Sequence, residues 1–297
     1  MSLNTVALEL VPPNVESGRE KALEDAQKVL RFSGEYGLGD RLSHVLIPGM
    51  IAEDDDRPIE MKPKLDVLDF WHMLQPELPG VKGICTQVTS FLDKAALDQR
   101  LTVLGDAGFE GIVFVGVPRT MSDGEGSGVA PTDALSLYDA TVPNRGVICI
   151  PTRDGERGRM TFKCEQGATF ALTQLLFSDT IVPFLRELAD TTDHRPEILL
   201  SFGFVPTVET RVGLINWLIQ DQGNAKVAAE QEFVKELAAS DPDRRRVMMV
   251  DLYKRVVDGV AELGFPLSIH FEPIYGVSGA AFRTFAEMLD YWSPSGA

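Results

Sequence analysis

The regular alternation of short apolar runs with longer amphipathic stretches constrains this fold more than any other feature of the sequence. Apolar runs of four to eight residues bounded by turn-forming residues are typical of buried strands. We expect strands at residues 5–11, 44–47, 83–89, 111–117, 146–151, 170–177, 197–205 and 266–271. Strands that alternate with helices predict βαβ units and a parallel sheet. Such units, repeated over 297 residues, predict an α/β fold: one (β/α)8 TIM barrel spanning residues 1–297.

Helical patterns fill the segments between these runs. We expect helices within residues 18–32, 65–74, 94–107, 132–138, 159–166, 180–189, 208–263 and 278–292. In the third of these, Leu97, Leu101 and Leu104 recur at helical spacing, with Asp93 as the N-cap and Gly108 at the end. The long stretch before the last strand is interrupted by Pro242, which predicts at least two helices there, more than the simple repeat requires.

The charge balance disfavours two classes of partner. Asp and Glu outnumber Lys and Arg by 44 to 28, a net charge of −16, which opposes binding to nucleic acid and to anionic lipid surfaces. No apolar run reaches the length of a membrane span, and the first residues do not resemble a signal peptide. We therefore expect a cytoplasmic protein with a small-molecule ligand.

One glutamate stands inside an apolar strand. Glu9 is the only charge in residues 5–11. Strand alternation places it on the face of Thr5 and Ala7, so that it would point into the barrel near the mouth. A buried carboxylate is costly unless it is paired or protonated, and a protonated carboxyl at a strand end is suited to general acid catalysis. The alternative is a structural ion pair with a core Arg or Lys.

Other polar side chains fall on predicted strands. Gln174, in the sixth, carries both a donor and an acceptor and is suited to a heteroaromatic edge, unless the backbone satisfies it. His270 and Glu272 share a face of the last strand and would line the mouth, unless the histidine is structural. The three cysteines are widely spaced, and no HxH or HExxH pattern occurs, so we expect neither a disulfide nor a metal site.

Several segments, in order along the chain, resemble the methylenetetrahydrofolate reductases. Leu8-Glu9-Leu10-Val11-Pro12-Pro13 is similar to the family's Phe-Glu-Phe-Phe-Pro-Pro opening. The segment from Lys163 to Ala168 is similar to Lys-(x)3-Gly-Ala, and the one from Ala171 to Phe177 to Ile-Thr-Gln-Phe-Phe-Phe. Gly203-Phe204-Val205-Pro206 resembles a Gly-Ile-Leu-Pro turn, and Ile269-His270-Phe271 the His-Phe pair of the last strand.

The resemblance implies a (β/α)8 barrel that reduces 5,10-methylenetetrahydrofolate to 5-methyltetrahydrofolate, in the one-carbon metabolism that serves methionine biosynthesis. Glu9 matches the family's general acid, which assists opening of the imidazolidine ring, and Gln174 matches the residue that hydrogen-bonds the pterin. We also expect substrate contacts from Gln87, His270 and Glu272.

The family's flavin motifs are not conserved in this chain. Phe114-Val115-Gly116-Val117-Pro118-Arg119 stands where the family has Leu-Arg-Gly-Asp, and Ile150-Pro151-Thr152-Arg153-Asp154 where it has Tyr-Pro-Glu-x-His. Of the residues that face the phosphates, Lys163 remains. We therefore expect direct hydride transfer from NADH, with FAD absent or weakly bound.

A basic cluster follows the fifth strand. It contains Arg153, Arg157, Arg159 and Lys163, interspersed with Asp154 and Glu156. We expect Lys163, Arg153 and Arg159 to bind the cofactor, although the cluster would also suit the folate glutamate tail or form a solvated helix face. Two other functions remain open: a folate-dependent one-carbon transferase or lyase, and a catalytically silent folate-binding barrel.

Overall fold

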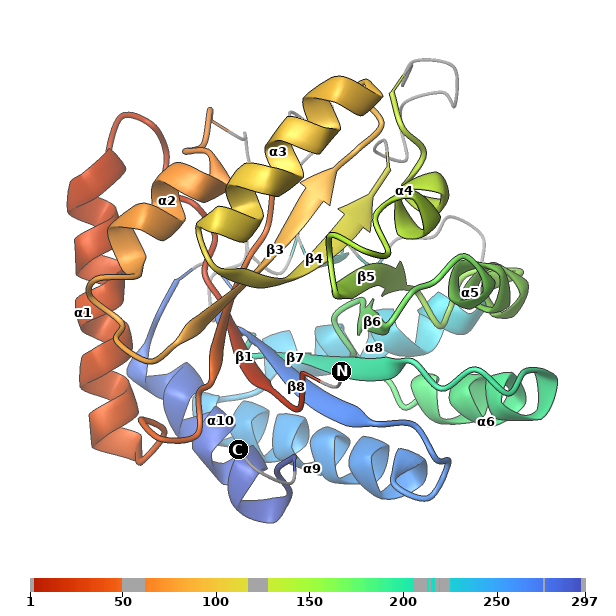
Figure 1. Ribbon diagram of the computed structural model, residues 1–297. Helices are drawn as coiled ribbons and strands as arrows, with labels where there is room; N and C mark the ends of the chain where they lie inside the picture. Colours follow the sequence, from red (N-terminus) through yellow and green to blue (C-terminus); the bar gives the residue numbers. More distant parts are fainter. Residues whose placement is uncertain are drawn as a thin grey trace.

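Eight parallel strands close into a barrel in the computed structural model, with each strand beside its neighbour in the sequence and β8 beside β1 (Figure 1). The structure describes residues 3–49, 62–116, 128–205, 213, 215–216, 219, 225–274 and 276–294. The strands are β1 (Val6–Glu9), β2 (His44–Ile47), β3 (Lys82–Val88), β4 (Phe109–Val115), β5 (Asn144–Cys149), β6 (Phe170–Thr173), β7 (Glu197–Gly203) and β8 (Leu267–Glu272). The predicted (β/α)8 TIM barrel is confirmed.

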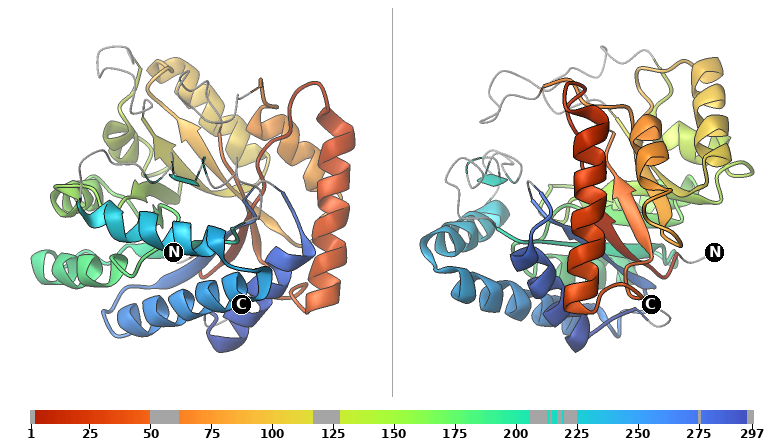
Figure 2. Two further views of the ribbon diagram at one scale, coloured as in Figure 1. Left: turned by 180° about the vertical axis from the view of Figure 1, so that it is seen from behind. Right: turned by 90° about the vertical axis from the view of Figure 1, so that its left-hand side faces the viewer.

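The helices cover the outside of the barrel, and α1 runs along its length (Figure 2). In the described part of the chain they are α1 (Gly18–Tyr36), α2 (Val67–Leu74), α3 (Lys94–Asp106), α4 (Pro131–Leu137), α5 (Glu156–Glu165), α6 (Ile181–Thr191), α8 (Ala225–Ala239), α9 (Pro242–Val260) and α10 (Gly279–Tyr291). The extra helix before β8 is therefore confirmed. Pro242 begins α9, because Asp241 caps this helix by accepting a 2.9 Å hydrogen bond from the Arg244 amide.

Several predicted boundaries were wrong, and two of them lie next to the ends of β5 and β6. The sixth strand was expected to continue to Phe177, but β6 ends at Thr173. Beyond that point the chain leaves the regular ladder, although the Leu176 amide still donates to the Ser201 carbonyl at 3.0 Å. The fifth helix begins at Glu156 rather than at residue 159, directly after Gly155, whose φ of 71° suits a glycine at a sharp turn.

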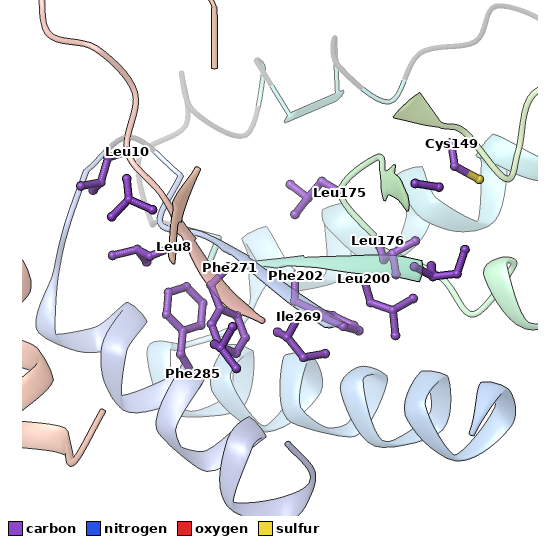
Figure 3. Packing of buried hydrophobic residues seen from close by; sticks show 14 of the residues in the cluster. Leu8, Leu10, Cys149, Leu175, Leu176, Leu200, Phe202, Ile269, Phe271 and Phe285 are labelled. Atoms are coloured by element: carbon purple, nitrogen blue, oxygen red, sulfur yellow. The ribbon is translucent and has the colours of Figure 1, made fainter. Parts of the chain in front are cut away.

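The strands bury two separate apolar surfaces. Seven buried side chains fill the barrel itself: Ala7, Leu46, Ile84, Val113, Phe170, Leu172 and Leu199. The opposite strand faces pack against the helices in a larger cluster, part of which is shown in Figure 3. There Phe271 of β8 stacks on Phe285 of α10, with ring centroids 4.3 Å apart. Every second residue of a strand therefore faces the barrel interior.

Glu197 closes the N-terminal end of the barrel. Its carboxylate accepts hydrogen bonds from the amides of Leu3 and Asn4, at 2.5 and 2.7 Å, and from the Ser268 hydroxyl. The Ser268 oxygen also accepts from the Thr5 amide at 2.8 Å. This end is a hydrogen-bonded plug. We call the opposite end, where the strands terminate and where barrels of this kind carry their sites, the open end. Among the described helices none is both long and apolar enough to cross a bilayer.

Phe170 fills the interior beside two glycines, and only one of them has no room for a side chain. A Cβ at Gly146 would overlap the Phe170 ring, three atoms of which would lie within 2.9 Å of it, whereas a Cβ at Gly111 would lie at an ordinary 3.4 Å. We predict that Gly146→Ala lowers the free energy of unfolding by about 1–3 kcal/mol through overpacking, while Gly111→Ala changes it by less than about 1 kcal/mol. Urea unfolding measures both. Equal stability of the two variants would contradict this packing.

Candidate functional site

Two carboxyl groups and one imidazole meet at the open end of the barrel. Glu9 ends β1 and Glu272 ends β8. His270 lies two residues before Glu272, on the same face of the strand. The His270 Nε2 atom is 3.7 Å from Glu9 Oε2, and its Nδ1 atom is 3.6 Å from Glu272 Oε1. The carboxyl side chains are 20% and 19% exposed and the imidazole 1%. The three groups form one cluster beneath the mouth.

Strand pairing explains why these residues meet. β1 and β8 are parallel neighbours with Ala7 opposite His270. Ala7 belongs to the barrel interior, and so by alternation do Glu9 on the same strand and His270 and Glu272 on the next. The residues between them, such as Leu8 and Phe271, point to the helices. The structure thus brings Glu9, His270 and Glu272 together where β1 and β8 end, and their chemical roles stay predictions.

Burial controls the charge of the cluster. It raises the pKa of Glu9 to about 7 and lowers the pKa of His270 to about 3. Burial also raises the pKa of Glu272 well above its usual value, and each carboxylate disfavours the ionisation of the other. At neutral pH the imidazole is therefore neutral and the carboxyl pair retains a proton. In the described part of the chain the ion-pair contacts of both carboxylates are with this imidazole alone, which opposes the alternative of a structural pair with Arg or Lys.

Ser201 is the member of the site that the sequence prediction missed. Its hydroxyl lies 2.9 Å from His270 Nδ1 and donates to the Thr173 carbonyl at 2.8 Å. It is fully buried in β7. The signal was a single hydroxyl within the otherwise apolar run from Ile198 to Phe202.

Gln174 lies at the same open end, immediately after β6. Its backbone N–H donates to the Cys149 carbonyl at 2.8 Å, so the pairing with β5 extends to this residue. Leu172 and Phe170, two and four residues earlier, face the barrel interior. The half-buried side chain therefore belongs to the face that leads into the barrel. The predicted contact with a pterin stays a prediction.

Gln87 is not brought to this cluster. Its strand neighbour Ile84 faces the barrel interior, and alternation turns Gln87 outward. The side-chain oxygen accepts from Arg100 Nε of α3 at 2.9 Å, and the side-chain nitrogen donates to the Val88 carbonyl at 2.7 Å. The predicted role of Gln87 in substrate binding thus gains no support from its position.

The basic cluster after β5 surrounds a buried carboxylate. Glu156 is 1% exposed and pairs with Lys163 at 3.0 Å. Lys163 also donates to the Ile148 carbonyl at 2.7 Å. Arg153 and Arg159 lie farther from Glu156, at 3.8 and 3.9 Å, and their side chains are 41% and 51% exposed. The two arginines therefore present guanidinium groups to solvent, while Lys163 is held inside the protein.

A metal ion is a second occupant to consider for the carboxyl–imidazole cluster. The ligand atoms of Glu9, His270 and Glu272 lie within 4.8 Å of one another. A metal must displace the protons of its ligands, and burial favours the protonated carboxyl groups here. The electrostatics therefore suit proton transfer better than metal binding.

Of the segment matched to the family's first flavin motif, residues 117–119 lie outside the described residues.

Comparison with known proteins agrees with this architecture. A family model described as mycobacterial methylenetetrahydrofolate reductase matches residues 2–296. A solved structure, described as an uncharacterized protein from Clostridium thermocellum that binds two copies of 5-methyl-5,6,7,8-tetrahydrofolic acid, superposes with a TM-score of 0.68. The match has 16% identity and covers 97% of this chain and 95% of that chain, so it shows a shared fold.

Two further solved structures match less well. A protein from Aquifex aeolicus VF5 has 15% identity over 86% of this chain and 92% of its own, with a TM-score of 0.41. The aldolase QR15 has 15% identity over 80% of this chain and 98% of its own, with a TM-score of 0.42. No curated protein matches the sequence significantly.

The raised pKa of Glu9 predicts a pH-dependent stability. The folded state binds this proton more tightly than the unfolded chain, so the free energy of unfolding falls as the pH rises from about 4.5 to about 7. Glutamine cannot ionise. We therefore expect Glu9→Gln to exceed the wild type in stability by about 2–4 kcal/mol at pH 8, at about 1.4 kcal/mol per pKa unit, and by less than about 1 kcal/mol at pH 5.

Urea unfolding at the two pH values tests this expectation. Glu262→Gln is a suitable control, because Glu262 is exposed and its replacement should change stability equally at both. A Glu9→Gln variant less stable than the wild type at pH 8 would show that Glu9 is ionised and favourably paired in the folded protein.

Proposed function

The chain belongs to the mycobacterial methylenetetrahydrofolate reductase family, and from this premise we propose that it reduces 5,10-methylenetetrahydrofolate to 5-methyltetrahydrofolate with NADH. The observation that carries the proposal is Glu9. Burial raises the pKa of this carboxyl group to about 7, so that a large fraction still carries its proton near neutral pH, and the group lies on a strand end at the open end of the barrel. General acids require this combination of burial, position and raised pKa.

The reaction needs one proton and one hydride. The Glu9 carboxyl donates its proton to N10 as the bond between N10 and the methylene carbon breaks, which leaves an iminium at N5. The hydride from the nicotinamide then forms the third C–H bond of the methyl group, and NADH becomes NAD+. His270 stays neutral in this step, because burial depresses its pKa to about 3. Glu272 supplies the second carboxyl group, on the other side of the imidazole.

Binding of the folate is assigned to the open end. Gln174 would pair its amide with the pterin edge, since a primary amide offers a donor and an acceptor in one plane. The likeness to a protein that binds 5-methyltetrahydrofolate supports a folate as the ligand class, through a shared fold. His270 and Glu272 would line the floor beneath the reacting carbon.

The nicotinamide cofactor would use Arg153 and Arg159. Both guanidinium groups are about half exposed and neither lies within hydrogen-bonding distance of Glu156, so they retain donors for the dinucleotide phosphates. Lys163 serves another purpose, because Glu156 and the Ile148 carbonyl already hold its ammonium group. The same observation speaks against a flavin bound as in the flavin-dependent methylenetetrahydrofolate reductases that the sequence resembles, since the matching lysine is not free to reach its phosphates.

Turnover by purified protein tests the proposal directly. NADH oxidation with 5,10-methylenetetrahydrofolate and no added flavin should yield 5-methyltetrahydrofolate. Glu9→Gln should lower kcat by about 100-fold or more, because general acids contribute about 10²–10⁴-fold. Its affinity for folate should stay within a few-fold, because glutamine preserves the shape. Glu262→Gln should retain full activity.

Other outcomes of this assay point to other functions. Folate binding without NADH binding would indicate a one-carbon transferase or lyase. Folate binding without any turnover, unchanged in Glu9→Gln, would indicate a silent binding barrel. Activity that requires added FAD would contradict direct hydride transfer.

Two single variants should separate the two ligands. Gln174→Ala should raise the dissociation constant of the folate about tenfold, through loss of hydrogen bonds worth about 1–1.5 kcal/mol, with little change for NADH. Arg153→Ala should weaken NADH several-fold and leave the folate unaffected. Binding titrations with each ligand alone measure both effects. Equal loss of both ligands in either variant would contradict separate sites.

A further inference from the structure

Two carboxyl groups flank one imidazole at this site, and the protonation of the ring decides which of them keeps a proton. Glu9 faces Nε2 of His270 and Glu272 faces Nδ1. A neutral imidazole carries hydrogen on one nitrogen and a lone pair on the other. Each of the two tautomers therefore favours a different distribution of charge over the carboxyl pair. This inference rests on the proposed role of Glu9.

Ser201 determines the tautomer. Its hydroxyl has a single hydrogen, and the Thr173 carbonyl, 2.8 Å away, can only accept it. That carbonyl lies past the last registered pair of β6 and β7, Leu172 with Leu199. The hydroxyl therefore supplies the hydrogen bond that the strand ladder supplies elsewhere. The Ser201 oxygen is then an acceptor toward His270 Nδ1 at 2.9 Å, which places the ring hydrogen on Nδ1.

The other ring nitrogen then carries the lone pair. His270 Nε2 is buried and has no hydrogen-bond partner, and it faces the Glu9 carboxyl at 3.7 Å. A lone pair beside a carboxylate disfavours the charged form of that carboxylate, whereas the N–H dipole on Nδ1 stabilises a negative charge on Glu272, 3.6 Å away. In the described part of the chain no Lys or Arg forms an ion pair with either group.

We propose that Ser201 is a positioning residue: by fixing the tautomer of His270, it assigns the proton shared by Glu9 and Glu272 to Glu9. The serine is fully buried. It acts through the imidazole, which holds the acid in its proton-donating form and leaves the negative charge on Glu272. Burial of the whole group, with the imidazole 1% exposed, strengthens these interactions because water does not screen them.

Nuclear magnetic resonance of the unliganded protein tests this assignment. The chain has four histidines, so ring ¹⁵N signals can be assigned by comparison with His270→Gln. We expect His270 to carry hydrogen on Nδ1 at pH 7. Side-chain ¹³C signals of labelled glutamates, assigned with Glu9→Gln and Glu272→Gln, should show Glu9 protonated and Glu272 ionised. Hydrogen on Nε2, or an ionised Glu9 beside a protonated Glu272, would overturn the proposal.

Ser201→Ala tests the cause. Without the hydroxyl, the preference for the Nδ1–H tautomer should weaken about tenfold, the equivalent of one hydrogen bond, so the averaged ¹⁵N signals should move toward each other. The kcat should fall by about twofold or more with the KM for folate unchanged, because only the proton-donating population decreases. An unchanged tautomer in Ser201→Ala would show that Ser201 does not set it.

A matched control is available in the same barrel. Ser268 is also a fully buried serine on the interior face, but it belongs to the plug at the opposite end. Ser268→Ala should leave the His270 signals in place, and a shift equal to that of Ser201→Ala would overturn the specific role of Ser201. The resonance measurements need neither folate nor NADH. They can therefore be interpreted even if the proposed reaction does not occur. The reaction assay can likewise be interpreted even if the tautomer assignment is wrong.

Discussion

The pairing of β1 with β8, which closes the barrel, is the contact on which the candidate site depends. Glu9 comes from the first strand and Glu272 from the last, and the sequence separates them by almost the whole chain. Parallel pairing with Ala7 opposite His270 places both carboxyl groups on the interior face at the same end. Barrel closure thus creates a pair of like charges in a place with little water, and the resulting desolvation turns ordinary glutamates into acids that hold a proton near neutral pH.

The barrel contains a second buried glutamate that shows the opposite solution. Glu197 at the N-terminal end accepts hydrogen bonds from two backbone amides and from Ser268. Hydrogen bonds of this kind satisfy a carboxylate and make it part of the structure. Glu9 has no such set among the described residues, and its carboxylate instead faces Nε2 of the neutral His270 imidazole at 3.7 Å. The difference in partners, rather than a difference in residue type, separates a structural carboxylate from a candidate acid.

The same reasoning separates the basic residues after β5. Lys163 matches the lysine of the family's motif, yet its ammonium group is held by Glu156 and a backbone carbonyl. Arg153 and Arg159 share that carboxylate at longer distances and remain about half exposed. On a chain with a net charge of −16, such exposed cations at the open end form a local exception to the overall field, which suits an anionic cofactor.

The sequence by itself determined the barrel and the end at which chemistry is expected. Eight apolar runs separated by helical stretches leave few arrangements, and the period of two places Glu9, His270 and Glu272 on interior faces without reference to any contact. It also determined that Pro242 divides the stretch before β8, because proline cannot continue a helix from within. The tertiary structure decided which predicted residues share a site. It turned Gln87 outward to Arg100 and added Ser201, whose role depends on a carbonyl and an imidazole from two other strands. Local patterns state which face a residue occupies, whereas partners across a barrel follow from strand register and from where each strand ends, which the sequence does not encode in any single segment.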